Sequence, residues 1–303
     1  MAMALDLGEQ GRRSAPPNPW VGCVVERDGQ VVGTGFHRAP GEPHAEPVAL
    51  AEAGERARGA TAWVTLEPCN HHGRTPPCTD GLIAAGVARV VVAVTDPDPG
   101  VTGGGIERLR AAGIAVEVGP GAAAVAASLR PYLHHRTTGR PYCVLKAAAS
   151  LDGRTAAADG SSQWITGPGA REDTHRLRAD SQAVVIGSGT ALADRPMLNV
   201  RLAEGVSRQP TRVLLDSTGR VPAAGPLFDP ALAPTLVLTT AAAAREAVKG
   251  WLEAGADVEV VAATGDGSGV DLAAALAVLG DRGVLQAMVE GGPTLHGALV
   301  RSG

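Results

Sequence analysis

The sequence predicts an α/β protein with two domains. The chain has 303 residues, of which 45% are hydrophobic and 19% charged, a composition that suits a folded chain with room for two cores. Short apolar, β-rich segments alternate with helical segments along its length, as in mixed or parallel sheets covered by helices. A polar stretch with Gly and Pro at residues 137–141 interrupts this alternation and is the best linker candidate.

The part before the linker predicts a three-layer domain. Pro16, Pro17 and Pro19 end a first helix, because proline cannot continue one. Asp28 and Gly29 join two strands as a hairpin turn. The expected strands are residues 20–25, 30–35, 62–66, 89–94 and 114–118, and the expected helices are residues 4–13, 44–58, 79–85, 105–112 and 122–135.

The part after the linker continues the alternation without a clear internal repeat. Pro168 near a first turn, followed by Glu172 and Asp173, begins a helix as the helix dipole favours. The expected strands are residues 142–146, 183–187, 211–216, 235–239, 257–262 and 285–289. The expected helices are residues 168–179, 241–253, 272–279 and one that begins at residue 294.

Four residues in the first part form a candidate metal centre. His44, Cys69 and Cys78 can hold zinc and leave a fourth position for water, whose pKa the ion lowers toward about 7. Glu46 can move protons to and from that water. Zinc nucleobase deaminases carry His-x-Glu followed by Pro-Cys-x-x-Cys. The order of residues agrees, but here eight residues separate the two cysteines instead of two.

Two other interpretations of these residues remain open. The cysteines could be buried thiols, although residues of all four types in this order make that a poor explanation. A structural zinc would need a fourth protein ligand, which His71 or His72 could supply. Glu46 favours catalysis over a structural or catalytically inactive zinc protein. Cys23 and Cys143 lie inside apolar segments and are expected in the core.

The bulk properties argue against several classes of protein. A net charge of -4, no long basic run and only 3% aromatic residues predict that the chain does not bind nucleic acid. No signal peptide and no apolar run of membrane-spanning length are visible, so no membrane association is expected. A cytoplasmic location is therefore the default expectation.

Three motifs together resemble one family. Residues 17–23 (PNPWVGC), 41–46 (GEPHAE) and 65–78 (TLEPCNHHGRTPPC) are similar to the bifunctional deaminase/reductase of riboflavin biosynthesis, which has the eight-residue cysteine spacing. The resemblance implies a cytidine-deaminase-like first domain that hydrolytically deaminates a phosphoribosylated diaminopyrimidine. It also implies pyrimidine contacts from Asn18, His37 and His71, and a contact of Arg74 with the ribose phosphate.

The second half resembles the reductase domain of that family. This resemblance implies a dihydrofolate-reductase-like fold and NADPH-dependent reduction of the ribosyl group to ribityl. The glycines at 291 and 292 follow a strand and open a helix, which alone is weak evidence for a phosphate site. The implied residues on the substrate side are Ser162, Arg178, Leu198, Arg201 and Glu290, and those on the NADPH side are Trp164, Thr190, Asp194, Gly292, Pro293 and Thr294.

The expected boundaries are residues 1–138 for the zinc deaminase and 139–303 for the reductase. The resemblance also implies closing strands after residue 303 and a homo-oligomer whose reductase domains pair. We therefore expect a reductase domain truncated at its end. The alternative is a deaminase-only enzyme with an inactive or impaired reductase domain, possibly in a related pathway. Zinc, NADPH and a phosphoribosylated pyrimidine are the expected small-molecule partners.

Overall fold

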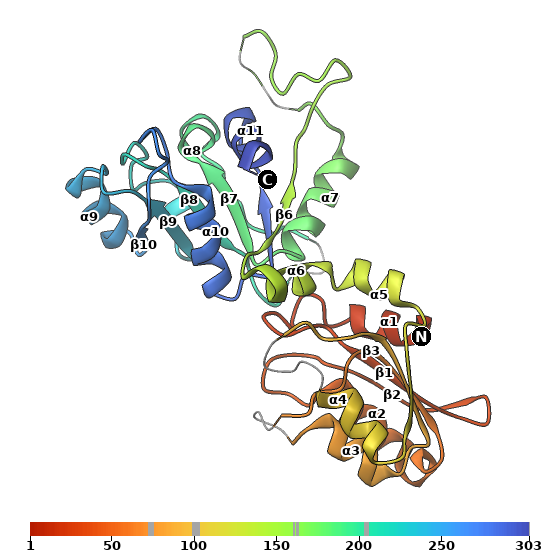
Figure 1. The fold of residues 1–303 in the computed structure, drawn as a ribbon. Coiled ribbons are helices and arrows are strands. Elements are labelled where there is room, and N and C mark those ends of the chain that lie inside the picture. Colours follow the sequence, from red (N-terminus) through yellow and green to blue (C-terminus); the bar gives the residue numbers. More distant parts are fainter. Residues whose placement is uncertain (72–75, 99–103, 160, 162–163, 203–205, 303) are drawn as a thin grey trace. The chain divides into compact units, whose positions relative to one another are not determined.

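The computed structural model describes residues 1–71, 76–98, 104–159, 161, 164–202 and 206–302. The chain divides into two compact units, Met1–Gly139 and Arg140–Gly303, which are coloured red to yellow-green and yellow-green to blue in Figure 1. Each unit has its own sheet and its own hydrophobic core. The two-part mixed α/β class predicted from the sequence is confirmed.

The first unit contains a five-stranded sheet with the order β2-β1-β3-β4-β5 in the described part of the chain. The central strand β3 pairs antiparallel with β1 and parallel with β4. Asp28 and Gly29 both have positive φ, at 54° and 76°, and form the predicted hairpin turn between β1 and β2. The strands are β1 (Gly22–Arg27), β2 (Gln30–Phe36), β3 (Thr61–Leu66), β4 (Arg89–Val94) and β5 (Ala115–Val118).

Helices cover both faces of this sheet, which gives the three predicted layers. Alternate strand residues pack with α2, α3 and α4 in one core cluster that includes Val25, Val64 and Val92. Helices α1 and α5 contact β1 and β4, respectively. The helices are α1 (Ala2–Glu9), α2 (Ala45–Ala53), the 3-10 turn η1 (Gly54–Ala57), α3 (Cys78–Ala85), α4 (Gly104–Ala111), α5 (Ala122–Ser128) and α6 (Arg130–Thr138).

Three helix predictions in this unit were wrong in length. The helix expected at 4–13 runs from Ala2 to Glu9, and turns follow it. The helix expected at 44–58 ends at Ala53, because Gly54 takes a positive φ of 55° and a 3-10 turn follows. The helix expected at 122–135 is two helices, since Pro131 lies in the first turn of α6, where its missing N–H costs nothing. Helix α6 continues through Thr138 to a left-handed Gly139, so the chain turns later than the expected linker begins.

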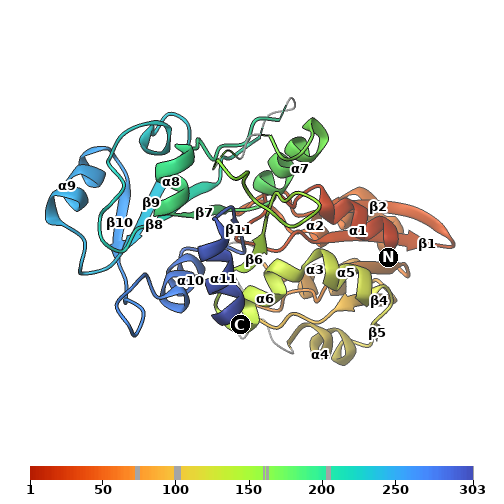
Figure 2. The same ribbon diagram turned by 90° about the horizontal axis from the view of Figure 1, so that it is seen from above.

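The second unit is built on a six-stranded sheet with the order β10-β9-β8-β7-β11-β6, and the described pairings are parallel. Helices α10 and α11 pack on one face, and α8 and α9 on the other (Figure 2). The strands are β6 (Tyr142–Leu145), β7 (Ala183–Gly187), β8 (Thr211–Leu215), β9 (Thr235–Thr239), β10 (Asp257–Val260) and β11 (Gln286–Val289). The helices are α7 (Pro168–Ala179), α8 (Ser188–Asp194), the 3-10 turn η2 (Pro226–Phe228), α9 (Arg245–Glu253), α10 (Leu272–Asp281) and α11 (Pro293–Ser302).

In this unit one helix was missed and two predictions were wrong. Helix α8 was not predicted, because its short Ser-Gly-Thr start has low helical propensity. Helix α9 begins at Arg245 instead of residue 241, since the Thr240 hydroxyl accepts a hydrogen bond from the Ala242 N–H and forms a turn there. Cys143 is only half-buried, because β6 pairs with β11 alone among the described strands, whereas Cys23 is fully buried as predicted.

Among the described residues, no helix combines the length and the apolar character that crossing a membrane would require.

Candidate active sites

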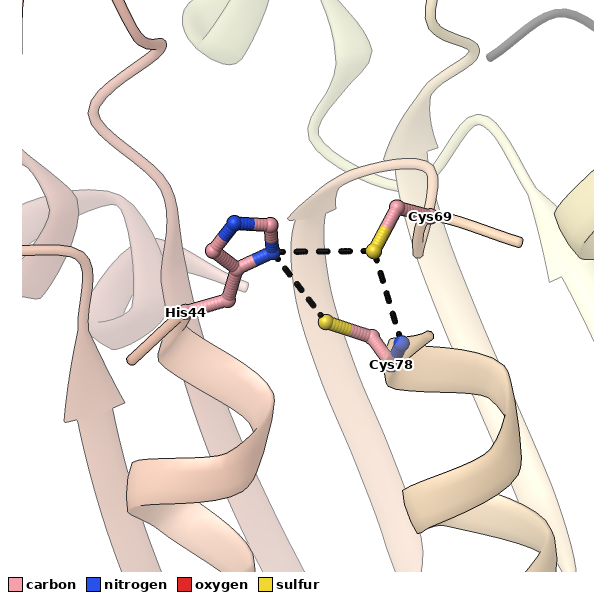
Figure 3. A group of neighbouring side chains, drawn as sticks. All are labelled: His44, Cys69 and Cys78. Carbon is pink, nitrogen blue, oxygen red and sulfur yellow. Dashed lines mark hydrogen bonds between the residues drawn. The ribbon is translucent and has the colours of Figure 1, made fainter. Parts of the chain in front are cut away.

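His44, Cys69 and Cys78 come together in the first unit, where their ligand atoms all lie within 4.8 Å of one another. Figure 3 shows the His44 ring facing both thiols. The Nδ1 atom of His44 is 3.6 Å from Sγ of Cys69 and 3.3 Å from Sγ of Cys78. Zinc bonds of about 2.0 Å to nitrogen and 2.3 Å to sulfur at a tetrahedral angle place the two atoms about 3.5 Å apart. The observed distances therefore fit one zinc ion held by these three side chains.

The fold explains why these three residues meet. His44 is the N-cap of α2 with extended backbone, Cys69 follows the end of β3, and Cys78 is the first residue of α3. Helix α2 lies unusually close to β2 at Gly35, where the absence of a side chain permits the approach. A Cβ atom there would be only 2.3 Å from the carbonyl oxygen of Ala45. This contact brings the start of α2 to the edge of the sheet where β3 ends.

The thiol of Cys69 is prepared for metal binding by the start of α3. The side chain of Cys78 hydrogen-bonds to that of Cys69, and the backbone N–H of Cys78 donates to the Cys69 Sγ at 3.4 Å. These contacts and His44 lower the pKa of Cys69 to about 4, and the same shared hydrogen bond raises the pKa of Cys78. A thiolate is the form that zinc binds.

Glu46 lies in the first turn of α2 and is 97% buried, since only 3% of its surface is exposed. Burial, and then the nearby Cys69, raise the pKa of this carboxyl group above its usual value. A carboxyl group with a raised pKa beside a candidate metal centre is suited to accepting and returning a proton near neutral pH.

Asn18 and His37 form a second polar group beside the metal centre. The rings of His37 and His44 contact edge to face, with their centroids 5.2 Å apart. Burial lowers the pKa of His37, so the ring is neutral and carries one N–H. Its Nδ1 lies 3.1 Å from the carbonyl oxygen of Pro43 and therefore donates, which leaves Nε2 to accept from the Asn18 amide at 3.0 Å. Both ring nitrogens of His37 thus have protein partners.

The remaining expected residues of this site are only partly described. His71 is exposed in the loop after Cys69, and among the described residues it does not belong to the group of candidate metal ligands. Arg74 lies outside the described residues, and so does His72, the other candidate for a fourth ligand.

The second unit contains a cavity of 2090 Å³ at the carboxyl ends of its strands. All the described residues that were expected to contact substrate or NADPH in this half line it, and Ser162 lies outside the described residues. The cavity volume, and the backbone of Gly291 and Gly292 before α11, fit a dinucleotide. The lining residues from the expected set are Trp164, Arg178, Thr190, Asp194, Leu198, Arg201, Glu290, Gly292, Pro293 and Thr294.

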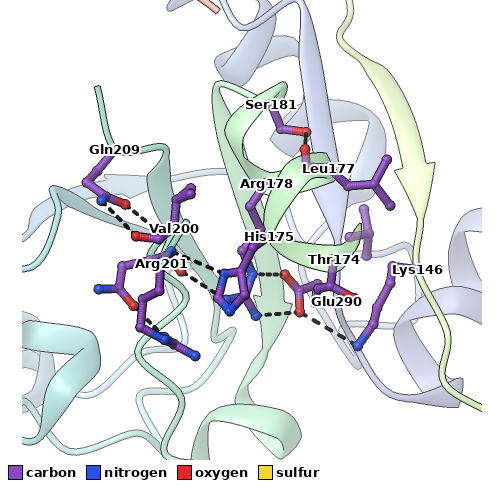
Figure 4. A network of polar contacts seen from close by, with 12 residues as sticks. Lys146, Thr174, His175, Leu177, Arg178, Ser181, Val200, Arg201, Gln209 and Glu290 are labelled. Atoms are coloured by element: carbon purple, nitrogen blue, oxygen red, sulfur yellow. Dashed lines mark hydrogen bonds and ion pairs between the residues drawn. The ribbon is translucent and has the colours of Figure 1, made fainter. Parts of the chain in front are cut away.

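Two residues that line this cavity form an ion pair (Figure 4). Arg178 on α7 contacts Glu290, which follows β11, through two bonds of 2.5 and 2.8 Å. Lys146, which follows β6, lies 3.9 Å from the same carboxylate. Both members of the pair are largely buried, at 11% and 7% exposure of their side chains. The pair places a cation and an anion in the cavity lining, where both can contact a bound ligand.

Sequence reasoning missed two polar residues at these sites. His175 on α7 lines the cavity, and its Nδ1 accepts a hydrogen bond from the backbone N–H of Arg201 at 3.3 Å. Glu67 is buried directly before the metal loop and accepts hydrogen bonds from two backbone N–H groups. An acid at the end of an apolar strand, immediately before Pro68 and Cys69, is the sequence signal that could have identified Glu67.

A His/Cys/Cys metal group with a buried glutamate fits a zinc deaminase, and the second α/β unit adds a cavity large enough for a dinucleotide, as a fused reductase would need. Comparisons with known proteins agree with this class. Residues 1–94 match the cytidine and deoxycytidylate deaminase zinc-binding region, and residues 141–303 match the RibD C-terminal domain. The chain therefore belongs to the RibD family, which carries the deaminase and reductase activities of riboflavin biosynthesis.

Two relatives resemble the chain over nearly its whole length. The riboflavin biosynthesis proteins RibD of Chlamydia pneumoniae and Escherichia coli K12 are 47% and 46% identical to it. The matches cover 99% and 100% of this chain, and 80% and 83% of the two relatives. The structure of Acinetobacter baumannii RibD, form 1, matches with a TM-score of 0.87 at 41% identity, covering 99% of this chain and 82% of that one.

A Thermotoga maritima protein extends the comparison to a named reaction pair. It is described as a diaminohydroxyphosphoribosylaminopyrimidine deaminase/5-amino-6-(5-phosphoribosylamino)uracil reductase. Its structure matches with a TM-score of 0.84 at 36% identity and covers 96% of this chain, which spans 79% of that one. The match of residues 141–303 to the RibD reductase model does not favour the deaminase-only alternative.

Proposed function

We propose that the first unit deaminates 2,5-diamino-6-(5-phosphoribosylamino)pyrimidin-4-one at the site formed by His44, Glu46, Cys69 and Cys78. The product would be 5-amino-6-(5-phosphoribosylamino)uracil, with release of ammonia. The observation that carries this proposal is the tetrahedral spacing of one nitrogen and two sulfurs beside a buried carboxyl group. In this proposal His44, Cys69 and Cys78 hold zinc, which supplies the Lewis-acid chemistry that makes water nucleophilic at neutral pH.

The chain's own residues divide the remaining work. Glu46 accepts a proton from the attacking water and delivers it to the departing amino group, for which its burial and raised pKa suit it. Asn18, whose amide N–H is taken by His37, turns its carbonyl oxygen toward donors on the pyrimidine. His71 and Arg74 follow the Cys69 ligand in the chain, and we propose them as contacts for the ring and for the ribose phosphate.

For the second unit, we propose reduction of the ribosyl group of that product to ribityl. NADPH, when bound, supplies the hydride. The proposal rests on the cavity and on the Arg178–Glu290 pair within it. Arg178, Leu198, Arg201 and Glu290, with Ser162, would contact the substrate. Trp164, Thr190, Asp194 and the Gly292–Thr294 turn would contact NADPH.

The decisive experiment replaces Glu46 with Gln, which keeps the shape of the side chain and removes its ability to exchange a proton. Zinc should stay at one ion per chain, and ammonia release from the diaminopyrimidine phosphate should fall by at least about 10²-fold. Ammonia release at the wild-type rate would refute the role of Glu46. A chain that binds no zinc would refute the metal centre itself.

Two further proposals concern the organisation of the enzyme. We assign the deaminase to residues 1–138 and the reductase to residues 139–303. The separation of the chain into two compact units next to Gly139 supports this assignment. We also propose that the chain forms a homo-oligomer with a phosphoribosylated pyrimidine as its small-molecule partner. Family resemblance supports the oligomer. Limited proteolysis near Gly139 and sedimentation analysis would test the two proposals separately.

A further inference from the structure

The two thiol ligands are connected by hydrogen bonds made at and just beyond each cysteine. The backbone N–H of Thr79 donates to the carbonyl oxygen of Cys69 at 3.2 Å. The hydroxyl of Thr79 donates to the side-chain oxygen of Asn70 at 3.0 Å. Residues 70 and 79 each follow a cysteine directly, so these two bonds tie the Cys69 segment to the start of α3 independently of any bound ion.

The surroundings leave this connection little freedom. Thr79 has no exposed surface, so its hydroxyl cannot exchange its partner for bulk water. A Cβ atom on Gly104, the first residue of α4, would lie 3.0 Å from the amide nitrogen of Asn70. The side chain of Asn70 is thus confined between α3 and α4.

The chain just before Cys69 is held equally firmly. The carboxylate of Glu67 accepts the backbone N–H of Asp96 at 3.4 Å and that of Ile106 at 3.2 Å. A Cβ atom on Gly105 would lie only 2.0 Å from the carbonyl oxygen of Pro68. Residues 67–70 are therefore anchored to the sheet and to α4, and the hydrogen bonds of Asn70 and Cys69 link them to Thr79 and the start of α3.

We propose that Asn70 and Thr79 are positioning residues for the zinc centre, and that their hydrogen bond holds the Cys69 and Cys78 thiols at the spacing that one ion requires. This inference rests on the proposed zinc site and adds two residues that do not touch the ion. Partners beyond the ligands themselves commonly change metal affinity by 10- to 100-fold when they are removed. The hydrogen bond is partly buried and its donor Thr79 fully so, and a lost hydroxyl takes this donor from the Asn70 oxygen.

The test compares Thr79→Val, which replaces the hydroxyl with a methyl group of similar size, with Thr79→Ser, which keeps the hydroxyl. Zinc release is followed with a chromophoric chelator, and the ligand-field bands of Co²⁺ bound in place of zinc report the geometry. We expect about 10-fold faster zinc release and altered Co²⁺ bands in Thr79→Val, and nearly wild-type behaviour in Thr79→Ser.

Thr65→Val is the matched control. Thr65 is also buried, at 1% exposure, and its hydroxyl accepts a hydrogen bond from the backbone N–H of Gly22 at 3.1 Å, away from Asn70. This variant should lower the stability of the first unit without changing zinc release. If it speeds zinc release as much as Thr79→Val does, the effect is general loosening and the proposal is wrong.

Asn70→Ala provides a second route if Thr79→Val does not fold, because Asn70 is only partly buried. It should also speed zinc release, and the double variant should be little worse than either single variant, since both remove the same bond. Wild-type zinc release in folded single variants would overturn the positioning role while leaving the zinc site intact. A wild-type chain without zinc would instead overturn the proposed deaminase site.

Discussion

Arg212 offers the sharpest test of how the second unit is held together. It lies on the central strand β8 with no exposed surface, although strand interiors rarely hold an arginine. Its guanidinium donates to the carbonyl oxygens of Pro226 at 2.5 Å and Asp229 at 2.9 Å, and also to that of Ala233. Burial lowers its pKa to about 10, so the side chain is still a cation at neutral pH.

The expected cost of Arg212→Met follows from these contacts. Methionine fills similar volume but removes the charged donor of all three carbonyl oxygens, and a hydrogen bond to a charged group contributes about 1.5 to 3 kcal/mol. The Pro226 and Asp229 oxygens keep the backbone N–H groups of Asp229 and Leu232, whereas no other hydrogen bond to the Ala233 oxygen is found among the described residues. Part of this loss is offset, because the desolvation cost of the buried cation disappears when the cation is removed. We expect a net loss of about 3 to 5 kcal/mol in the free energy of unfolding of the second unit, a large part of the usual 5 to 15 kcal/mol.

The assay is urea unfolding read by hydrogen exchange of separate peptides. Peptides from β8 should lose protection at lower urea concentration in Arg212→Met, whereas peptides from β3 in the first unit should be unchanged. The free energy of unfolding of Arg212→Lys should lie between those of the wild type and Arg212→Met, because an ammonium group keeps the charge but reaches fewer carbonyls. A change below about 1 kcal/mol for Arg212→Met would show that the buried cation is not what holds residues 226–233.

Two further substitutions test the first unit. Gly35→Ala should push α2 away from β2 and weaken zinc binding by about 10-fold in a chelator competition, whereas Gly81→Ala, which has ordinary space around it, should leave zinc affinity unchanged. His37→Asn keeps a group near the position of Nδ1 and removes the acceptor of the Asn18 amide, so it should raise KM for the diaminopyrimidine about fivefold with a smaller effect on kcat. An unchanged KM in steady-state ammonia assays would remove His37 from the site.

The sequence was most informative where one short segment carries the chemistry. Cys69 and Cys78 frame a single loop, and prolines 68, 76 and 77 mark where the strand ends and the helix begins. The approach of the two cysteines to His44 could therefore be expected. The strands at 89–94, 183–187 and 235–239 lie where they were predicted, because continuous runs of Val, Leu and Ile indicate strands buried on both faces.

The remaining features depend on tertiary contacts that no local pattern encodes. Arg212 looks like a surface residue in its strand, and its acceptors come from distant loops, three of them at residues 226–233 and one at Met197. His37 was expected to contact substrate, yet both of its ring nitrogens are used within the protein. Thr79 resembles any residue in the first turn of a helix until α4 closes over its partner Asn70.

The two candidate sites share no residue, since the described residues of each belong to a single unit. The two chemistries should therefore be separable by substitution. Glu290→Gln leaves two cations, Arg178 and Lys146, facing a neutral amide, and breaking a buried pair costs about 3 kcal/mol or more. This variant should lose NADPH oxidation with the deaminated pyrimidine but keep ammonia release, and Glu46→Gln should do the reverse. If Glu290→Gln also abolished ammonia release while zinc and the fold of the first unit were retained, deamination would require an intact second unit, and the assignment of one activity to each unit would fail.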